Sequence, residues 1–152
     1  MDNERLIDLR EEKDLLQKEV AKEIGVVESV YSEWENGKLS IPTKRLVELA
    51  NFFEVNIDYM VGISNIRTKI KSNNTIDTEL VSNRLKEIRK SLKLTMRELA
   101  EKFNTTSSAI SNYENNKFLI LSPFLIELAK YSNYSIDWIL GRSNEKFIQQ
   151  KK

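Results

Sequence analysis

The sequence predicts an all-α protein built from two tandem five-helix domains. The chain matches itself without a gap over about 60 positions at an offset of 79 residues, which indicates a duplicated unit. Its leucine-rich stretches repeat apolar residues at intervals of three and four, the spacing of helices that face a core. No stretch keeps the alternation of a strand for long. Helices this short are marginal alone, so each copy must pack its own helices into one core.

Each helix is predicted from its apolar spacing and from the residues that end it. The helices of the first copy are expected at residues 2–13, 17–24, 28–36, 43–53 and 57–61. Those of the second copy are expected at residues 79–92, 96–103, 107–115, 122–132 and 136–140. The clearest apolar stripes are Val81, Leu85, Ile88 and Leu92, and Leu46, Leu49, Ala50 and Phe53. Helices are closed by residues that accept a left-handed backbone, namely Gly25, Gly37, Asn104 and Asn116.

The segment 94–117 predicts two short helices joined by a tight corner. Thr95 and Glu98 have the spacing of a capping box, which satisfies free N–H groups at a helix start. Thr105 or Thr106 then caps the second helix. Its inward face is Ala109, Ile110 and Tyr113, and its outward face is Ser107, Ser108, Ser111 and Asn112. A short helix with small hydrogen-bonding side chains outside fits a DNA major groove.

The composition excludes most catalytic and metal chemistry. The 152 residues include no cysteine and no histidine, so disulfides, zinc sites and the usual nucleophile–base pairs cannot form. Catalysis by carboxylates alone or by a Ser–Lys pair stays open, but no motif points to it, and we predict no enzyme, no cofactor and no metal. The acidic opening MDNERLID is unlike a signal peptide, and the longest nearly apolar run, 118–126, is too short for a bilayer. We therefore expect a cytoplasmic protein.

The repeat sets the expected domain boundaries. We place an acidic N-terminal domain at 1–65, a linker at 66–78, a basic C-terminal domain at 79–143 and a tail at 144–152. Residues 1–65 hold 8 Lys/Arg against 14 Asp/Glu, a net charge of −6, whereas residues 79–152 hold 13 against 8, a net charge of +5.

The linker is polar and carries a net charge of +2. Fully extended, at roughly 3.3 Å per residue, it reaches about 40 Å, enough to span half-sites about 34 Å apart. Whether it is slack or docked stays open. Because neutralising phosphates dominates DNA affinity, the basic copy with this linker is the expected DNA-binding half.

Both copies resemble the Cro/phage-repressor type of helix-turn-helix domain, the Xre-like family of bacterial and phage transcription regulators. The resemblance covers about residues 5–64 and 84–143. It is carried by LTMRELAEKFNTTSSAISNYENNK with SIDWILG in the second copy, and by LLQKEVAKEIGVVESVYSEWENGK with NIDYMVG in the first. It implies two lambda-repressor-like five-helix domains, each placing its third helix in the major groove of double-stranded DNA. It also implies one structural ion pair per copy, namely Arg10 with Glu35 and Arg89 with Glu114.

The resemblance further implies which residues touch DNA. The implied base-reading residues are Thr106, Ser107, Ser108, Ser111 and Asn112. The implied phosphate contacts are Gln17, Asn36 and Lys38 in the first copy, and Arg97, Asn115 and Lys117 in the second. The second copy departs from the family pattern in having Met96 where glutamine is usual. Arg97 and the free N–H groups beside it are the expected substitute.

The two copies differ in their third helices. That of the first copy, VESVYSEWENG, carries Glu28 and Glu33 where a reading helix usually carries amides or arginine. A glutamate can accept a hydrogen bond from cytosine, so base reading stays open. Carboxylates beside phosphates nevertheless cost affinity. We hypothesise that the first copy binds DNA weakly or not at all and contacts a protein partner instead.

The loop after the third helix also differs. In the second copy it is apolar and includes Phe118, Leu119, Ile120 and Phe124, where the first copy reads LSIPTK. These side chains either pack into their own core or form an exposed patch for subunit pairing. Family members also pair through the fifth helix, here with Trp138 and Ile139. We expect a homodimer.

These features predict a sequence-specific DNA-binding transcription regulator, associated with the nucleoid of a bacterium or with a phage. We expect a repressor that reads the major groove mainly with the helix at 107–115. The second reader is either the first copy or a dimer mate, and we favour the dimer mate. The alternative is a protein-binding helix-turn-helix module of the antitoxin or anti-repressor type. Steeply salt-dependent DNA binding would distinguish the two.

Overall fold

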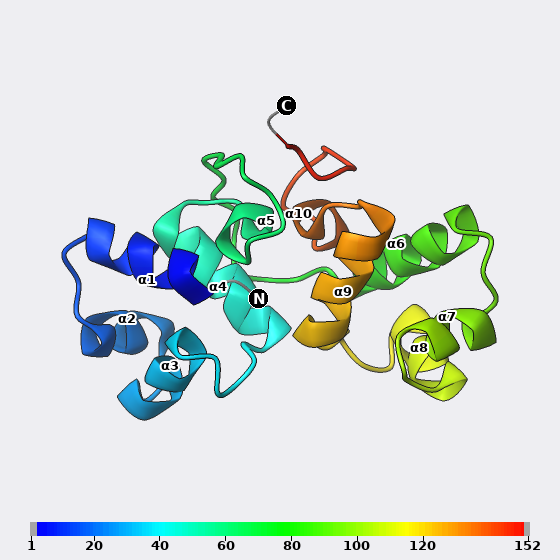
Figure 1. The fold of residues 1–152 in the computed structure, drawn as a ribbon, viewed down its shortest axis with the longest axis horizontal. Coiled ribbons are helices and arrows are strands. Elements are labelled where there is room, and N and C mark those ends of the chain that lie inside the picture. The colour runs from blue at the N-terminus through cyan, green and yellow to red at the C-terminus, as the bar shows by residue number, and fades with distance from the viewer. Residues whose placement is uncertain (1–2, 151–152) are drawn as a thin grey trace. The chain divides into compact units, whose positions relative to one another are not determined.

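The computed structural model describes residues 3–150, which form helices and connecting segments without any named strand (Figure 1). Contacts divide the chain into two units. One comprises the residues up to 74 together with Gln149 and Gln150, and the other comprises residues 75–148. Each unit contains five helices, so the predicted all-α fold with a tandem repeat is confirmed in the described part of the chain.

The helices lie where their spacing and caps predict. The N-terminal unit contains α1 (Asn3–Glu12), α2 (Gln17–Ile24), α3 (Glu28–Glu35), α4 (Thr43–Phe53) and α5 (Ile57–Met60). The C-terminal unit contains α6 (Thr78–Ser91), α7 (Met96–Lys102), α8 (Ser107–Glu114), α9 (Ser122–Ser132) and α10 (Ile136–Ile139). Every predicted end agrees to within one residue, except that the predicted start at residue 2 lies outside the described residues.

Each unit has its own apolar core. Buried core side chains of the N-terminal unit include Leu6, Tyr31, Leu46, Leu49 and Ile57. Those of the C-terminal unit include Ile88, Ile110, Ile120, Leu125 and Leu128. Burying one such side chain contributes about 1.5–3 kcal/mol to folding. Because these residues come from several helices of their unit, the core holds α3 and α8 in fixed positions.

Residues with a left-handed backbone conformation form the turns before and after α3 and α8. Asn104 has φ 55° between α7 and α8, and Gly25 has φ 82° at the equivalent corner of the N-terminal unit. After α3, Gly37 has a φ of 80°, which favours glycine, and an added Cβ would meet only the end of the Asn3 side chain, whose Nδ2 lies 2.6 Å away. Asn116, with φ 58°, takes the equivalent place after α8. All four predicted helix-closing positions are confirmed.

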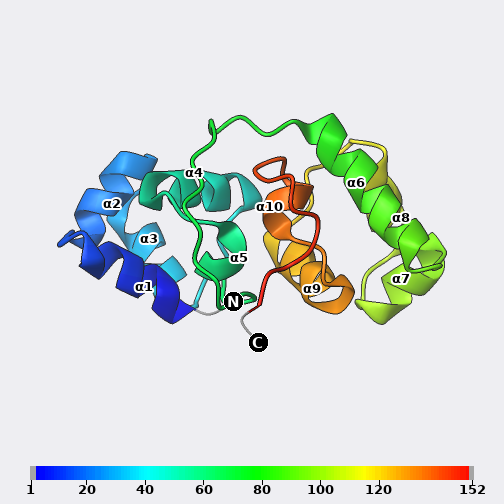
Figure 2. The same ribbon diagram turned by 90° about the horizontal axis from the view of Figure 1, so that it is seen from above.

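The segment that follows α5 is docked, which answers the question that the sequence leaves open. The Asn56 side chain donates to Ile66 O (3.1 Å) and accepts from the Thr68 N–H (2.9 Å). Asn51 Oδ1, from α4, accepts from the Ser72 N–H (3.0 Å), and the segment runs past α4 in Figure 2. Residues 66–72 therefore pack as part of the N-terminal unit and do not form a free tether.

The segment that follows α10 docks in the same way. The Ser135 N–H donates to Lys146 O (2.9 Å), Ile148 is buried, and the ring centroids of Tyr134 and Phe147 lie 4.9 Å apart. Each repeat therefore extends beyond its fifth helix, which the polar sequence does not indicate. The predicted limits at 65 and 143 precede these docked segments and stay predictions for the extent of independently folding domains.

Replacing Asn56 with alanine is expected to release the docked segment. The buried amide makes two side-chain hydrogen bonds, and losing them costs about 1–3 kcal/mol of local stability. Trypsin cleavage after Arg67 and Lys69 should then rise roughly 5- to 150-fold, since it follows local opening. Limited proteolysis with mass identification measures this, with Asn83→Ala on the exposed side of α6 as the control. Equal cleavage rates at both sites in all three proteins would contradict the docking.

Candidate nucleic-acid interface

Threonine hydroxyls cap α7 and α8. Thr95 Oγ1 accepts from the Glu98 N–H (3.1 Å), and Glu98 Oε1 accepts from the Thr95 N–H (3.0 Å), so the predicted capping box is confirmed. The hydrogen bond from the Thr95 N–H holds the pKa of the Glu98 carboxyl below its usual range. Thr106, and not Thr105, caps α8, since its Oγ1 accepts from the Ala109 N–H (3.1 Å).

The outward face of α8 carries small polar side chains. Ser107, Ser108, Ser111 and Asn112 are at helix positions i, i+1, i+4 and i+5, which share one face, and Thr106 caps the same end. Thr106, Ser107 and Ser108 are exposed, whereas Ser111 and Asn112 are half-buried. The structure thus brings the five predicted base-reading residues together. That they read bases stays a prediction.

An ion pair anchors the end of α8 to α6. Arg89 Nε lies 2.7 Å from Glu114 Oε2, and its terminal nitrogens bond Glu114 Oε1 (3.0 Å) and Leu94 O (3.0 Å). The Glu114 side chain is 2% exposed and that of Arg89 is 13% exposed, so little water reaches the pair. Through Leu94, the same guanidinium also holds the turn that leads into α7.

The predicted phosphate-contacting residues of the C-terminal unit differ in whether their side chains bond other residues of the protein. Arg97 pairs with Glu101 at 3.3 Å, but both side chains are exposed and such surface pairs contribute little. The Asn115 amide donates to Ser111 Oγ (3.0 Å), and Lys117 is exposed just after α8. The Arg97 and Lys117 cations are therefore accessible to an anionic ligand.

Two of the three equivalent residues of the N-terminal unit have side chains that hydrogen-bond other residues of the protein. Arg10 Nε lies 2.8 Å from Glu35 Oε2, and Gln17 Nε2 donates to Glu35 Oε1 (3.0 Å). Asn36 Oδ1 accepts from the backbone N–H of Lys38 (3.0 Å), and the Lys38 residue is exposed. Of the three phosphate contacts predicted here, only Lys38 presents a side chain with no such bond within the described chain.

The N-terminal unit should lose stability in acid through Glu35. Burial raises the pKa of the Glu35 carboxyl, but hydrogen bonds, above all from Arg10, lower it by more, so its pKa lies below the usual range. A lowered folded-state pKa contributes stability that is fully present above the unfolded value, about 4.3, and is lost as pH falls through the folded value. In acid titrations followed by circular dichroism, the Glu35→Gln variant should therefore lose less stability than the wild type below about pH 4. The exposed control Glu28→Gln should follow the wild type, and equal losses in all three proteins would contradict this role of Glu35.

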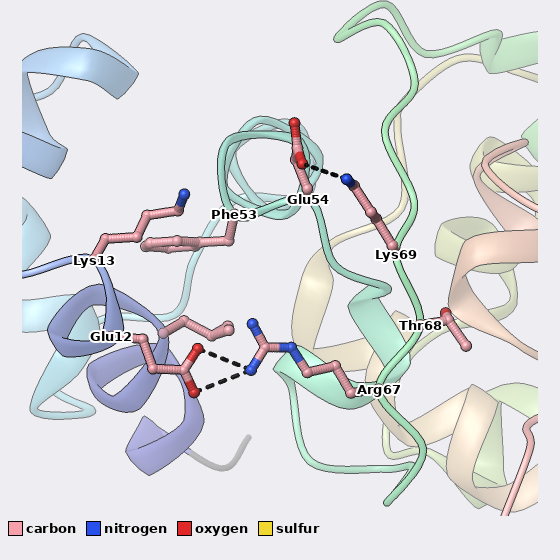
Figure 3. A pocket seen from close by; sticks show the side chains of 8 residues that line it. Glu12, Lys13, Phe53, Glu54, Arg67, Thr68 and Lys69 are labelled. Carbon is pink, nitrogen blue, oxygen red and sulfur yellow. Dashed lines mark hydrogen bonds and ion pairs between the residues drawn. The ribbon is translucent and has the colours of Figure 1, made fainter.

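The cations of the predicted linker face carboxylates of the N-terminal unit. Several of these residues line a pocket of about 500 Å³. In it, Arg67 Nη1 donates to both carboxylate oxygens of Glu12 (3.0 and 2.8 Å), the two contacts drawn as dashed lines in Figure 3. Lys69 Nζ and Lys71 Nζ each lie 3.5 Å from Glu54. These charges partly offset the acidity of the N-terminal unit. Residues 66–72 thus pack with the acidic unit, and the expectation that the linker acts with the basic copy in binding DNA stays a prediction.

The apolar segment after α8 is only partly exposed. Ile120 is 1% exposed and belongs to the core, whereas Leu119 and Phe124 are half-buried. Phe118 and Leu121 are exposed at 63% and 65%. Two further predicted interface residues of the fifth helix, Trp138 and Ile139, are buried. Ile120, Trp138 and Ile139 therefore pack inside the protein, which is the other possibility that the sequence leaves open. They do not belong to an exposed patch for subunit pairing.

Two exposed apolar residues at helix starts are not among the residues predicted from the sequence. Leu16 precedes α2 and is 56% exposed, and Val27 precedes α3 and is 64% exposed. Neither side chain accepts a capping hydrogen bond. The signal is present in the repeat, because at the offset of 79 these positions correspond to the capping residues Thr95 and Thr106.

Within residues 3–150, no group of acidic side chains is arranged to hold a metal ion. Every helix in this part of the chain is too short or too polar to cross a bilayer.

Comparisons with known proteins agree with this architecture. A family model described as a helix-turn-helix domain matches residues 82–145, and a second, described as helix-turn-helix, matches residues 6–60. The chain is 40% identical over 74 residues to the cryptic phage CTXphi transcriptional repressor RstR of Vibrio cholerae. That match covers 47% of this chain and 67% of the relative.

A second relative is the uncharacterised HTH-type transcriptional regulator YobD of Bacillus subtilis (strain 168). It is 33% identical over 61 residues, which cover 40% of this chain and 54% of YobD. The chain thus spans about two thirds and about half of the lengths of these two curated relatives. No solved structure matches the chain.

Proposed function

This chain belongs to the Cro/phage-repressor (Xre-like) helix-turn-helix family of DNA-binding transcription regulators, and from that premise we propose that it is a sequence-specific repressor reading the major groove mainly with α8. The observation that carries this proposal is the outward face of α8. It presents hydroxyls and one carboxamide and no acidic side chain, on a helix anchored at both ends by the Thr106 cap and the Arg89–Glu114 pair.

The chemistry of that face determines what it can read. The Asn112 carboxamide can pair in two places with an adenine edge, which discriminates against a wrong base by about 1–3 kcal/mol. The hydroxyls of Thr106, Ser107 and Ser108 accept or donate and are less selective. We therefore expect an adenine opposite Asn112 to be the best-defined base of each half-site.

Arg97 and Lys117 bind phosphates and so fix the position of α8 along the DNA. Both side chains are accessible, and Arg97 stands next to Met96, where family members usually carry glutamine. The N–H groups at the start of α7 add a partial positive charge. Asn115 supports this contact less directly, because its amide bonds Ser111.

A second reading helix is supplied by a second copy of the chain. Residues 66–72 are docked on the N-terminal unit, so most of the predicted linker cannot act as a flexible tether between two half-sites. The α3 face of the N-terminal unit carries Glu28 and Glu33, which phosphates would repel. Pairing of two chains through Phe118 and Leu121, the exposed part of the apolar segment, gives a homodimer with two α8 helices. The predicted protein-binding role of the N-terminal unit is compatible with this assembly.

Removing one phosphate contact should change the salt dependence of DNA binding. Selection from random duplexes identifies the site, and titrations at several salt concentrations give the slope of log affinity against log salt. Lys117→Gln is expected to reduce that slope by about 1. Lys38→Gln, at the matching position of the N-terminal unit, should leave it unchanged. Equal changes in both variants would contradict the assignment of α8 as the main reader, and salt-independent binding would favour the antitoxin or anti-repressor alternative.

A further inference from the structure

The α2–α3 face of the N-terminal unit, defined here by Leu16, Val27, Glu28, Glu33 and Leu39, combines exposed apolar side chains with carboxylates. Leu16 and Val27 precede α2 and α3, and Leu39 follows α3 with 45% of its surface exposed. Glu28 is exposed at the first turn of α3 and Glu33 is half-buried one turn later. The outer surface of α3 is therefore acidic, and apolar residues lie beyond both of its ends.

Folding does not explain the two apolar residues at the helix starts. Replacing a Thr or Ser cap by a residue that cannot accept a hydrogen bond destabilises a helix. The Glu19 carboxylate still accepts from the Leu16 N–H (2.9 Å), but the Leu16 side chain returns no hydrogen bond to α2. Val27 leaves the start of α3 without a side-chain cap as well. At more than half exposed, both side chains also contribute little to the core.

DNA is a poor occupant for this face. The helix α3, ESVYSEWE, contains no basic residue, and leucine and valine offer phosphates no hydrogen-bond donor. Among the described residues, neither Glu28 nor Glu33 has an ion-pair partner within 4.0 Å. A second copy of the same face would also be repelled, since it would bring carboxylates against carboxylates.

We propose that the α2–α3 face of the N-terminal unit docks a protein segment whose apolar side chains are flanked by lysine or arginine. Leu16, Val27 and Leu39 supply the apolar contacts, while Glu28 and Glu33 pair with the cations and exclude nucleic acid. This inference deepens the protein-binding part of the proposed function and is independent of whether α8 reads DNA. The chain would then hold a regulatory partner and DNA on different units.

The repeat supplies a matched variant that tests the proposal without weakening the fold. Leu16→Thr, Val27→Thr, Glu28→Ser and Glu33→Asn replace each residue by the one at the same position of the C-terminal unit. Because two of these changes restore hydroxyl caps, the combined variant should unfold at the same or a higher denaturant concentration than the wild type. If the combined variant binds peptides less tightly than the wild type, the loss can therefore be assigned to the changed α2–α3 face and not to unfolding.

The probe is a displayed library of random 16-residue peptides, selected on the full-length wild type and depleted on the combined variant. Enriched peptides should contain apolar residues flanked by Lys or Arg. When synthesised, they should bind the wild type at least 10-fold more tightly than the variant, as measured by fluorescence anisotropy. In parallel, the affinity of the full chain for its selected duplex should be the same in both proteins.

Three results would overturn the proposal. One is a library in which no peptide prefers the wild type, and another is a preference for peptides that lack basic residues. The third is a variant that binds the selected duplex at least 10-fold more weakly, which would make the face a DNA reader. Failure of the wild type to bind any duplex would count against the repressor function and not against peptide docking, so the two failures are distinguishable.

Discussion

The Glu114→Ala variant is expected to destabilise the C-terminal unit by about 3 kcal/mol, the size typical of removing one partner from a buried ion pair. The substitution leaves the Arg89 guanidinium, which is 13% exposed, without its carboxylate and with little water to replace it. Arg89 also bonds Leu94 O, so disorder should reach the start of α7 as well as the end of α8. DNA affinity should fall together with stability.

Denaturant unfolding followed by tryptophan fluorescence measures this effect. The chain has two tryptophans, so a Trp34→Phe background leaves Trp138 as the only reporter, and it lies in the C-terminal unit. In that background the exposed control Glu101→Ala, which breaks the surface pair with Arg97, should change stability by under about 0.5 kcal/mol. Combining Arg89→Met with Glu114→Leu should recover most of the loss, because an apolar pair needs no compensating charge. Similar midpoints for Glu114→Ala and Glu101→Ala would contradict a structural role for the pair.

The helices and corners could be predicted because their signals are local. A stripe such as Val81, Leu85 and Ile88 and a cap such as Thr95 act within a few residues, and the structure places their helices within one residue of the prediction. The Arg89–Glu114 pair links residues 25 apart and was predicted only through the family resemblance. Its geometry in the structure agrees with that resemblance.

Long-range contacts explain what the sequence could not predict. Residues 66–72 are polar, as a flexible tether would be. The Asn51 and Asn56 side chains nevertheless hydrogen-bond backbone groups of this segment. Such contacts do not depend on the segment's own side chains, so its sequence does not indicate them. Ile120 looks like its apolar neighbours, and only packing distinguishes it from the exposed Phe118. The exposure of Leu16 could have been suspected, since its counterpart in the repeat is a capping threonine.

The central claim, that α8 reads DNA and α3 does not, is tested most directly by adding one carboxylate to each helix. Ser108 and Ser29 are the second residues of α8 and α3, occupy the same position of the repeat, and are both exposed. An acidic residue in the first turn of a helix is favourable for folding, so neither Ser108→Asp nor Ser29→Asp should unfold the protein.

The measurement is the affinity of each full-length variant for the duplex selected by the wild type, at one fixed salt concentration. Ser108→Asp should weaken binding by roughly 100-fold or more, because it removes a base contact and places a negative charge in the groove. Ser29→Asp should bind as the wild type does. The account is contradicted if Ser108→Asp binds like the wild type, or if Ser29→Asp weakens binding as much as Ser108→Asp.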